Sequence, residues 1–156
     1  MQETTLVIPL RKNQILLGFK KRGFGAGRWN GFGGKIEDNE TVAAAAAREL
    51  AEESLIDRAT LSKHGVMDFT FADGIPAIRM HVFRADTDRE PKETEEMRPQ
   101  WFHLDEIPFA EMWPADRYWY PLFLRGQFFR ATFHLSNEKE SRIIDRHIEV
   151  VSSRML

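Results

Sequence analysis

The sequence predicts an α/β (α+β) fold in which helices pack on the faces of a mixed β-sheet. Runs rich in β-branched and aromatic residues occupy both ends of the chain, and two segments of strong helix propensity lie between them. Strands on both sides of the helices are typical of a sheet that buries one face of each helix. The 156 residues contain no repeat or linker, so we expect a single domain spanning residues 1–156.

Turn residues separate the predicted strands. Residues 11–13, Arg-Lys-Asn, divide the first two β-rich runs, and the pair Asp73-Gly74 divides two later runs that alternate loosely. A short aromatic run follows, and two further runs enclose the polar sequence SNEKES near the end of the chain. We therefore expect strands at 4–10, 14–20, 61–72, 75–85, 101–104, 128–135 and 143–151.

Two helices and two loops account for the remaining segments. Residues 41–54 have strong helix propensity with almost no helix breakers, and residues 114–126 form a second predicted helix with Gly126 as its C-terminal stop. The stretch KKRGFGAGRWNGFGGK holds six glycines, so we expect an irregular loop whose backbone can approach a ligand closely. Residues 86–98 are polar and charged, which indicates another loop.

Composition narrows the function classes. A net charge of −2 argues against broad electrostatic binding to nucleic acid polymers or membranes, and no apolar run approaches the length of a membrane span. Cysteine is absent, which excludes disulfides and thiolate metal sites. The first residues lack the apolar run of a signal peptide, so we expect a cytoplasmic monomer that binds a small molecule. Twelve phenylalanines and four tryptophans are many for this length, which indicates that some line a pocket.

Three glutamates share one face of the first predicted helix. At 100° per residue, Glu49, Glu52 and Glu53 are spaced i, i+3 and i+4, and they repel one another there. For the glutamates alone, a solvated surface is the simpler interpretation. A hard divalent cation reverses the repulsion, however, because Mg²⁺ prefers carboxylate oxygens. The small side chains expected to face the sheet are those of Ala43, Ala46, Ala47 and Leu50.

A fixed pattern surrounds these glutamates. Five residues separate Gly34 from Glu40, and seven separate Glu40 from the run RELAEE at 48–53. This pattern resembles the conserved box of the Nudix hydrolases, and the resemblance implies a Nudix-type α/β/α sandwich with a mixed β-sheet. One position departs, because Leu55 stands where the family usually has a glycine in a left-handed turn. A leucine there costs on the order of 1 kcal/mol or forces another exit from the helix.

The resemblance implies a metal-dependent phosphoanhydride hydrolase that uses Mg²⁺, with Mn²⁺ as an alternative. The implied catalytic residues are Glu53, Glu52 and Arg48. Glu53 is the first choice for the general base and Glu52 the second, because the sequence does not separate metal ligation from proton abstraction. Arg48 is suited to hold a neighbouring carboxylate through a forked hydrogen bond. The implied metal ligands are the backbone carbonyl of Gly33 and the side chains of Glu49, Glu52, Glu53 and Glu96; without the family, Glu96 reads as a solvated glutamate.

Segments outside the box narrow the substrate. Residues 20–35, 81–83, 96–102 and 112–121 resemble the animal MutT-homologue branch of the family, which hydrolyses oxidised purine nucleoside triphosphates such as 8-oxo-dGTP and 2-hydroxy-dATP. The resemblance implies cleavage to the monophosphate and pyrophosphate, which sanitises the nucleotide pool, with O6- or N6-methylated purines as further candidates. The alternatives are a Nudix hydrolase of another nucleoside diphosphate derivative and a non-catalytic nucleotide-sensing module. The complete set of box residues argues against the module.

The same resemblance implies a set of substrate-binding residues. Asn30 would hydrogen-bond a purine edge, and Trp113 would stack on the base. Ordinary core packing is the alternative for Phe69, Phe71 and Trp119. In chain order, the implied residues are Thr5, Lys20, Phe24, Asn30, Phe32, Gly33, Gly34, Lys35, Phe69, Phe71, Trp113, Pro114, Ala115, Asp116 and Trp119.

One further departure from the family bears on the substrate. The animal relatives carry two consecutive aspartates after a Trp-Pro pair, whereas this chain carries Ala115 and Asp116. Two adjacent carboxyls can share a proton, so that one donates a hydrogen bond while the other accepts one. With one carboxyl remaining, we expect weaker binding of 8-oxo-dGTP, or a preference for a purine whose edge requires only Asp116.

Overall fold

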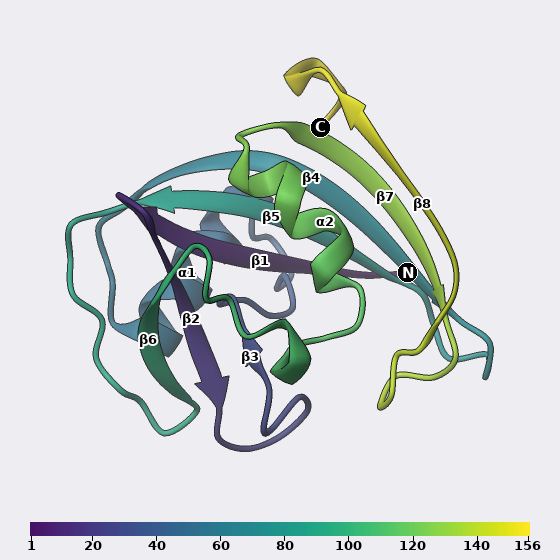
Figure 1. Cartoon of the computed structure of the whole chain (residues 1–156), viewed down its shortest axis with the longest axis horizontal. Helices are drawn as coiled ribbons and strands as arrows, with labels where there is room; N and C mark the ends of the chain where they lie inside the picture. Colours follow the sequence, from purple (N-terminus) through teal and green to yellow (C-terminus); the bar gives the residue numbers. More distant parts are fainter.

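The computed structural model describes residues 1–156, and its eight β-strands form one mixed sheet (Figure 1). The strand order is β3-β2-β1-β5-β4-β7-β8, and β6 pairs with the free edge of β2. The pairs β1–β5 and β4–β7 are parallel and the others antiparallel, which confirms the mixed sheet. The strands are β1 (Gln2–Arg11), β2 (Gln14–Lys20), β3 (Trp29–Asn30), β4 (Thr60–Phe71), β5 (Ile78–Asp86), β6 (Met97–His103), β7 (Phe128–Leu135) and β8 (Ile143–Val151).

Two helices lie on opposite faces of this sheet. In Figure 1, α2 (Asp116–Leu124) crosses in front of the strands and α1 (Val42–Ser54) lies behind them. Successive residues of β1 point to alternate faces and so enter two separate cores. Leu6 and Ile8 belong to the cluster that includes the buried side chains of α2, and Val7 belongs to the cluster beneath α1. The predicted layering of helices on both faces of a mixed sheet is therefore confirmed.

Several element boundaries differ from the prediction. β6 begins at Met97 rather than at residue 101, because it pairs with β2 along the whole of both strands. The two-residue strand β3 lies inside the segment predicted as an irregular loop, where it pairs with the end of β2. The second helix starts at Asp116 and ends at Leu124, so it is shorter than 114–126. Short 3₁₀ turns are also present at Phe109–Glu111 and Ser153–Met155.

Helix α1 is rotated relative to the prediction. Its buried side chains include Ala45, Ala46 and Leu50, whereas Ala43 and Ala47 are exposed. The expectation for these last two alanines was wrong, because the buried stripe follows i, i+4 and i+8 and so continues to Glu53 rather than away from it. Of the three glutamates, Glu53 is consequently buried.

The start and end of α1 are both fixed by local chemistry. The hydroxyl of Thr41 accepts a hydrogen bond from the backbone N–H of Ala44 at 3.1 Å, as an N-cap does. At the other end, Leu55 adopts the left-handed conformation with φ 61° and ψ 22°, and its N–H donates to the carbonyl of Ala51. The leucine therefore takes the same exit that a glycine would, at a strain of about 1 kcal/mol.

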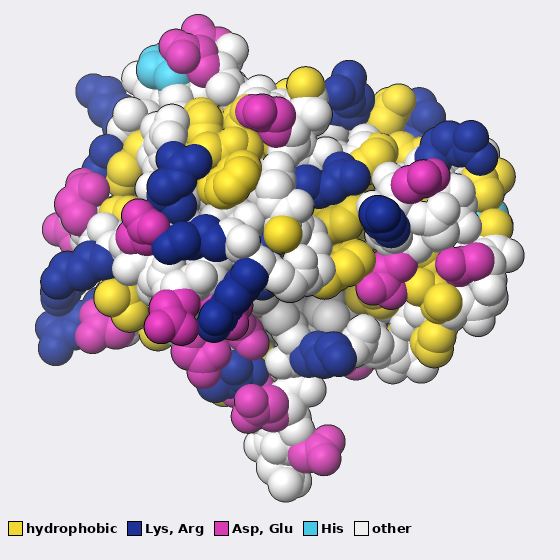
Figure 2. Space-filling model, turned by 90° about the horizontal axis from the view of Figure 1, so that it is seen from below, with side chains coloured by type: hydrophobic (Ala, Val, Ile, Leu, Met, Phe, Trp, Pro, Cys, Tyr) yellow, Lys and Arg dark blue, Asp and Glu magenta, His cyan; other side chains and the backbone are white.

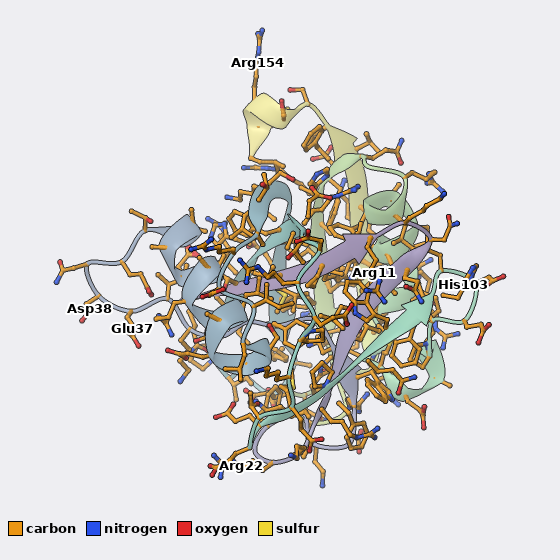
Figure 3. All side chains as sticks on the ribbon, turned by 90° about the vertical axis from the view of Figure 1, so that its left-hand side faces the viewer. Arg11, Arg22, Glu37, Asp38, His103 and Arg154 are labelled. Carbon is orange, nitrogen blue, oxygen red and sulfur yellow. The ribbon has the colours of Figure 1, made fainter.

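The surface carries charges of both signs. Figure 2 shows acidic and basic side chains interspersed over the face viewed there, with small hydrophobic areas between them. Glu37 and Asp38, in the loop before α1, project away from the body of the protein (Figure 3). None of the helices has the length and apolar character needed to cross a membrane.

Candidate active site

Two glycines bring the loop before α1 into contact with both β1 and α1. The N–H of Thr5 donates to the carbonyl of Gly34 at 2.9 Å, so this loop runs beside β1. A Cβ atom at Gly33 would lie 1.9 Å from the carbonyl oxygen of Thr5, and one at Gly34 would lie 2.6 Å from Oε1 of Glu49. Only glycine therefore fits at Gly33, where the clash is with backbone, whereas a side chain at Gly34 would displace the carboxylate of Glu49.

Arg48 organises the acidic face of α1. Its guanidinium donates two hydrogen bonds to the carboxylate of Glu40, at 2.7 and 2.9 Å, and a third to Glu49 at 3.0 Å. The bond from Arg48 is the main reason that the pKa of Glu40 falls to about 2, and it raises the pKa of Arg48 in turn. A longer contact of 3.4 Å reaches Glu52. Glu40 and Arg48 thus hold the acidic face in place, which gives a structural reason for their fixed spacing.

Glu53 is the buried member of the acidic face. It is 5 % exposed, and its Oε1 accepts a hydrogen bond from the N–H of Gly33 at 2.9 Å. Nζ of Lys20 lies 3.9 Å from Glu53 and 3.4 Å from Glu96. Burial raises the pKa of Glu53 to about 7, although the Gly33 bond and the charge of Lys20 oppose that rise. A carboxyl with a pKa near the working pH is suited to accept and return a proton.

The donor atoms around Glu53 suit a hard divalent cation. Every candidate ligand offers oxygen, and burial raises the pKa of Glu49 as well as that of Glu53, so a cation would stabilise both ionised forms. No three acidic or imidazole groups converge into a ready-made metal cluster. Mg²⁺ is commonly held by one or two carboxylates together with waters and substrate phosphates. The residues present therefore fit such an ion.

A cavity of about 590 Å³ opens beside Glu53 and extends across the α2 face of the sheet. It spans the distance from the glycine loop at one side to Trp113 and Asp116 at the other. Most of the predicted substrate-binding residues contribute to its walls: Thr5, Lys20, Phe24, Asn30, Gly33, Gly34, Lys35, Phe69, Phe71, Trp113, Ala115 and Asp116.

Three predicted binding residues lie away from this cavity. Phe32 is fully buried beneath α1, because its ring fills the space above Gly18. Trp119 is fully buried in the α2 core, and its indole N–H donates to Oδ1 of Asp116 at 3.2 Å. Pro114 faces a separate groove on the outer side of the chain. The structure brings none of these three into the cavity wall, and Trp119 instead supports Asp116.

The box residues other than Glu53 and the glycines also lie outside the cavity walls. Arg48 and Glu49 are packed against the loop that precedes α1. The side chain of Glu52 is 58 % exposed, and that of Glu96 is 48 % exposed beside Lys20. None of these carboxylates contributes to the cavity wall, so only a ligand that extends beyond the cavity would reach them.

Asp116 is the single buried carboxyl of the inner wall. It is 5 % exposed, and its second oxygen accepts the N–H of Trp113 at 3.1 Å while the first accepts the indole of Trp119. Burial raises the pKa of Asp116 to about 7, against the opposing effect of these two hydrogen bonds. Ala115 beside it is buried and offers no polar group. Asp116 therefore offers the cavity a buried carboxyl whose pKa lies near neutrality.

Two further parts of the cavity wall are the hydroxyl of Thr5 and the ring of Trp113. The hydroxyl of Thr5 is buried without any hydrogen-bond partner, so it is free to bond to a ligand. The ring of Trp113 stacks on Phe24 at a centroid distance of 5.2 Å, and the guanidinium of Arg28 lies 4.2 Å from the Trp113 centroid. Phe24 is 58 % exposed, so this aromatic wall stands at the open rim.

Sequence reasoning missed several wall residues. Ile78 and Met80 point into the cavity from β5, and their i, i+2 spacing was the available indication that they share a face. Met67 and Leu135 line it from β4 and β7 in the same way. Glu138, in the turn between β7 and β8, also lines the cavity, and no sequence pattern indicated that this turn folds back over the sheet.

The sequence of this chain matches a known protein family and two animal proteins. The family model for the NUDIX domain matches residues 1–123. A mouse (Mus musculus) protein named oxidized purine nucleoside triphosphate hydrolase is 50% identical over 135 residues, which cover 86% of this chain and 86% of the mouse protein. A zebrafish (Danio rerio) protein of the same name is 50% identical over 130 residues, or 83% of each chain.

Solved structures agree on the fold. The crystal structure of a MutT protein from Bacillus halodurans superposes with a TM-score of 0.83 over 96% of this chain and 98% of that one, at 24% sequence identity. This likeness confirms the predicted Nudix-type fold, and the family model together with the two animal relatives confirms the resemblance seen in the box. Members of this family generally require a divalent metal ion. The chain belongs to the Nudix family and is a Nudix hydrolase.

Proposed function

We propose that this chain hydrolyses oxidised or otherwise modified purine nucleoside triphosphates to the monophosphate and pyrophosphate. The observation that carries the proposal is the shared cavity, which joins the buried carboxyl of Asp116 to the hydrogen-bonded pair of Gly33 and Glu53. A nucleotide has a base at one end and phosphates at the other, and the two ends of the cavity match that polarity. The names of the mouse and zebrafish relatives support the same substrate class.

The end of the cavity that holds Trp113 and Asp116 has the chemistry of a base pocket. Trp113 offers an aromatic surface, and stacking of a base on such a surface contributes roughly 1–3 kcal/mol. Asn30, also in the wall, presents an amide that can pair with a purine edge. Asp116 donates a hydrogen bond when protonated and accepts one when ionised, and both states are populated when its pKa is about 7. Oxidation or alkylation of a purine changes the donors and acceptors that such a carboxyl reads.

The end of the cavity beside the glycine loop has the chemistry of a phosphate site. Lys20 and Lys35 contribute to its walls and carry positive charge toward polyphosphate. The donors that we propose for the metal ion are the carbonyl of Gly33 and the carboxylates of Glu49, Glu52, Glu53 and Glu96. Mg²⁺ suits these oxygens, and Mn²⁺ is the alternative. When bound, the ion neutralises negative charge on the phosphate oxygens.

Glu53 is the best placed general base. Its burial, its bond to Gly33 and a pKa of about 7 prepare one carboxylate oxygen to take a proton from the attacking water. Glu52 remains the second candidate, but its side chain is 58 % exposed and lies outside the cavity walls. Arg48 acts through its partners, because it fixes Glu40 and Glu49 rather than reaching the cavity. All of these groups come from one chain, so we propose that a monomer acts on the nucleotide pool of the cytoplasm.

Analysis of the reaction products tests this proposal. With Mg²⁺ and 8-oxo-dGTP, we expect 8-oxo-dGMP and pyrophosphate in equal amounts, resolved by anion-exchange chromatography. Release of orthophosphate and the diphosphate, or no cleavage of any modified purine, would reject it. Ala115 favours a second candidate within the family, namely hydrolysis of a different nucleoside diphosphate derivative, since the inner wall holds only one carboxyl. Nucleotide sugars and dinucleotides in the same assay separate the two candidates.

A further inference from the structure

The turn between β7 and β8 closes one side of the cavity. β7 ends at Leu135, whose side chain lines the cavity, and the turn that follows brings Glu138 and Ser141 into the same wall. The hydroxyl of Ser141 donates to the carbonyl of Glu138 at 2.9 Å, and the side chain of Asn137 accepts the N–H of Glu140 at 2.7 Å. Ser141 is only 7 % exposed. Glu138 is therefore presented to the cavity by an anchored turn rather than by a loose loop.

The carboxylate of Glu138 has no partner within the protein. The hydrogen bond at this residue uses its backbone carbonyl, and no cation forms an ion pair with its side chain. Asp116 differs, because both of its oxygens already accept hydrogen bonds from Trp113 and Trp119. An ionised carboxylate has acceptors and no donor, so only a donor group on the ligand complements Glu138.

The position of Glu138 indicates which part of the ligand it meets. Lys20 ends β2, and Glu138 follows β7, which lies four strands further along the sheet order β2-β1-β5-β4-β7. Strands β1, β5 and β4 lie between these two residues in the sheet, so Glu138 is separated from Lys20 across its width. A carboxylate repels phosphate, so its placement at the end away from Lys20 agrees with a role at the base rather than at the phosphates.

We propose that Glu138 is a specificity-determining residue that accepts hydrogen bonds from N–H donors on the edge of the bound purine. The inference rests on the proposed hydrolysis of purine triphosphates, and it adds the carboxylate of Glu138 as a group that recognises the base. Ala115 offers no carboxyl beside Asp116, and the β7–β8 turn supplies a further acceptor to the cavity wall from a different segment of the chain. A guanine-like edge, which places a ring N–H beside an amino group, offers the two donors that a carboxylate accepts together.

The test compares the binding of two nucleotide products by isothermal titration calorimetry. The probes are 8-oxo-dGMP and 8-oxo-dIMP, which lacks the 2-amino group. The variants are Glu138→Ala, Glu138→Gln and, as a matched control, Glu140→Ala, because Glu140 lies on the same turn and faces a different groove. We expect Glu138→Ala to weaken binding of 8-oxo-dGMP about tenfold and to reduce its preference over 8-oxo-dIMP. Glu138→Gln keeps an acceptor oxygen and loses less, and Glu140→Ala stays within about twofold of the wild type.

The outcomes separate this inference from the proposed function. If Glu138→Ala binds 8-oxo-dGMP as Glu140→Ala does, Glu138 reads no base donor and the inference fails. Equal losses for both probes would also overturn it, because 8-oxo-dIMP keeps the sugar and the ring N–H groups and lacks only the amino group of the two-donor edge. If the wild-type protein hydrolyses no modified purine triphosphate faster than its unmodified counterpart, the proposed function fails before Glu138 is considered. Thermal unfolding midpoints that match the wild type show that each variant keeps its fold.

Discussion

The backbone N–H of Gly33 donates a hydrogen bond to Oε1 of Glu53 at 2.9 Å, between residues that are 20 positions apart in the sequence. This contact joins the glycine loop to the buried face of α1 and fixes one oxygen of the carboxyl that we assign as the general base. The two halves of the Nudix box thus depend on each other, because the glycine allows the approach and the helix supplies the carboxylate.

Replacement of Glu53 by glutamine tests the assignment of the base. Glu53→Gln keeps the size of the side chain and an oxygen for the Gly33 N–H but removes the proton acceptor. We expect kcat/KM to fall roughly 10²–10⁴-fold while the Kd of the product nucleotide changes little. Glu52→Gln is the matched control and should lose less activity. A loss for Glu52→Gln as large as that for Glu53→Gln would reassign the base.

A methyl group at Gly33 should destabilise the protein through steric overlap. Its Cβ would lie 1.9 Å from the carbonyl oxygen of Thr5, and a backbone atom cannot swing aside as a side chain can. We expect Gly33→Ala to lower the free energy of unfolding in urea by about 3 kcal/mol or more. Gly74→Ala, at φ +85° with open space around it, should cost only about 1 kcal/mol. Equal costs at the two positions would mean that the loop relaxes away from β1.

The sequence predicted the acidic face of α1 but not which side of the helix is buried. The spacing of Gly34, Glu40 and the run at 48–53 identified the box, because a helix converts fixed sequence offsets into fixed directions. The rotation of α1 was not predictable from the same offsets, since packing against the sheet decided that Ala45 rather than Ala47 is buried. Helical periodicity gives relative angles among side chains and leaves the absolute orientation to tertiary contacts.

The cavity shows where sequence reasoning reached its limit. The aromatic residues of the rim were identified through the family resemblance, but Phe32 and Trp119 belong to the core, which composition does not distinguish from a pocket. No sequence pattern predicted that Glu138 lines the cavity, because its place there depends on how the β7–β8 turn folds over strands that are distant in the sequence. Long-range contacts of this kind carry no local pattern.

Leu55 offers a prediction about stability alone. Its φ of 61° strains a leucine by about 1–2 kcal/mol, and its side chain is 52 % exposed, so little hydrophobic burial is lost on its removal. Leu55→Gly should raise the free energy of unfolding by about 1 kcal/mol after the extra flexibility of the unfolded chain is counted. Leu55→Ala keeps a Cβ in the left-handed region and should show no gain. Stabilisation by alanine equal to that by glycine would reject the strain as the cause.

The buried carboxyl of Asp116 predicts a pH dependence of stability. Its pKa rises from 3.8 to about 7 on burial, so between these values the folded protein holds a proton that the unfolded chain releases. The free energy of unfolding therefore falls as the pH rises through this window. Asp116→Asn removes this contribution. Between about pH 5 and pH 8, we expect the free energy of unfolding of Asp116→Asn to fall less than that of the wild type, and the two falls to differ by on the order of a few kcal/mol.

Two other carboxyls serve as checks on that experiment. Burial gives Glu53 a pKa of about 7 as well. Glu53 is present in both the wild type and Asp116→Asn, so its contribution cancels in the difference between their free energies of unfolding. Glu40, whose pKa is about 2, stays ionised across the whole window. Urea unfolding in metal-free buffer with a chelator measures both proteins at each pH. Parallel stability curves for the wild type and Asp116→Asn would show that Asp116 does not hold the extra proton.

Restoring a carboxyl at position 115 tests the inner wall. Ala115→Asp places a second carboxyl beside Asp116, so that one can donate while the other accepts. We expect the ratio of kcat/KM for 8-oxo-dGTP to that for O6-methyl-dGTP to rise about tenfold, in line with one recovered hydrogen bond to a charged group. Ala115→Asn is the neutral control. An unchanged ratio in Ala115→Asp would remove Ala115 from the determinants of substrate choice.

Pyrophosphate release with Mg²⁺ across 8-oxo-dGTP, 2-hydroxy-dATP, O6-methyl-dGTP, N6-methyl-dATP, dGTP and dATP tests the central claim most directly. The proposed function predicts that at least one modified purine has a kcat/KM well above that of its unmodified counterpart, and that Glu53→Gln lowers this value roughly 10²–10⁴-fold. Equal rates on modified and unmodified nucleotides would contradict a role in sanitation, and they would leave the cavity as the site of a less selective Nudix hydrolase.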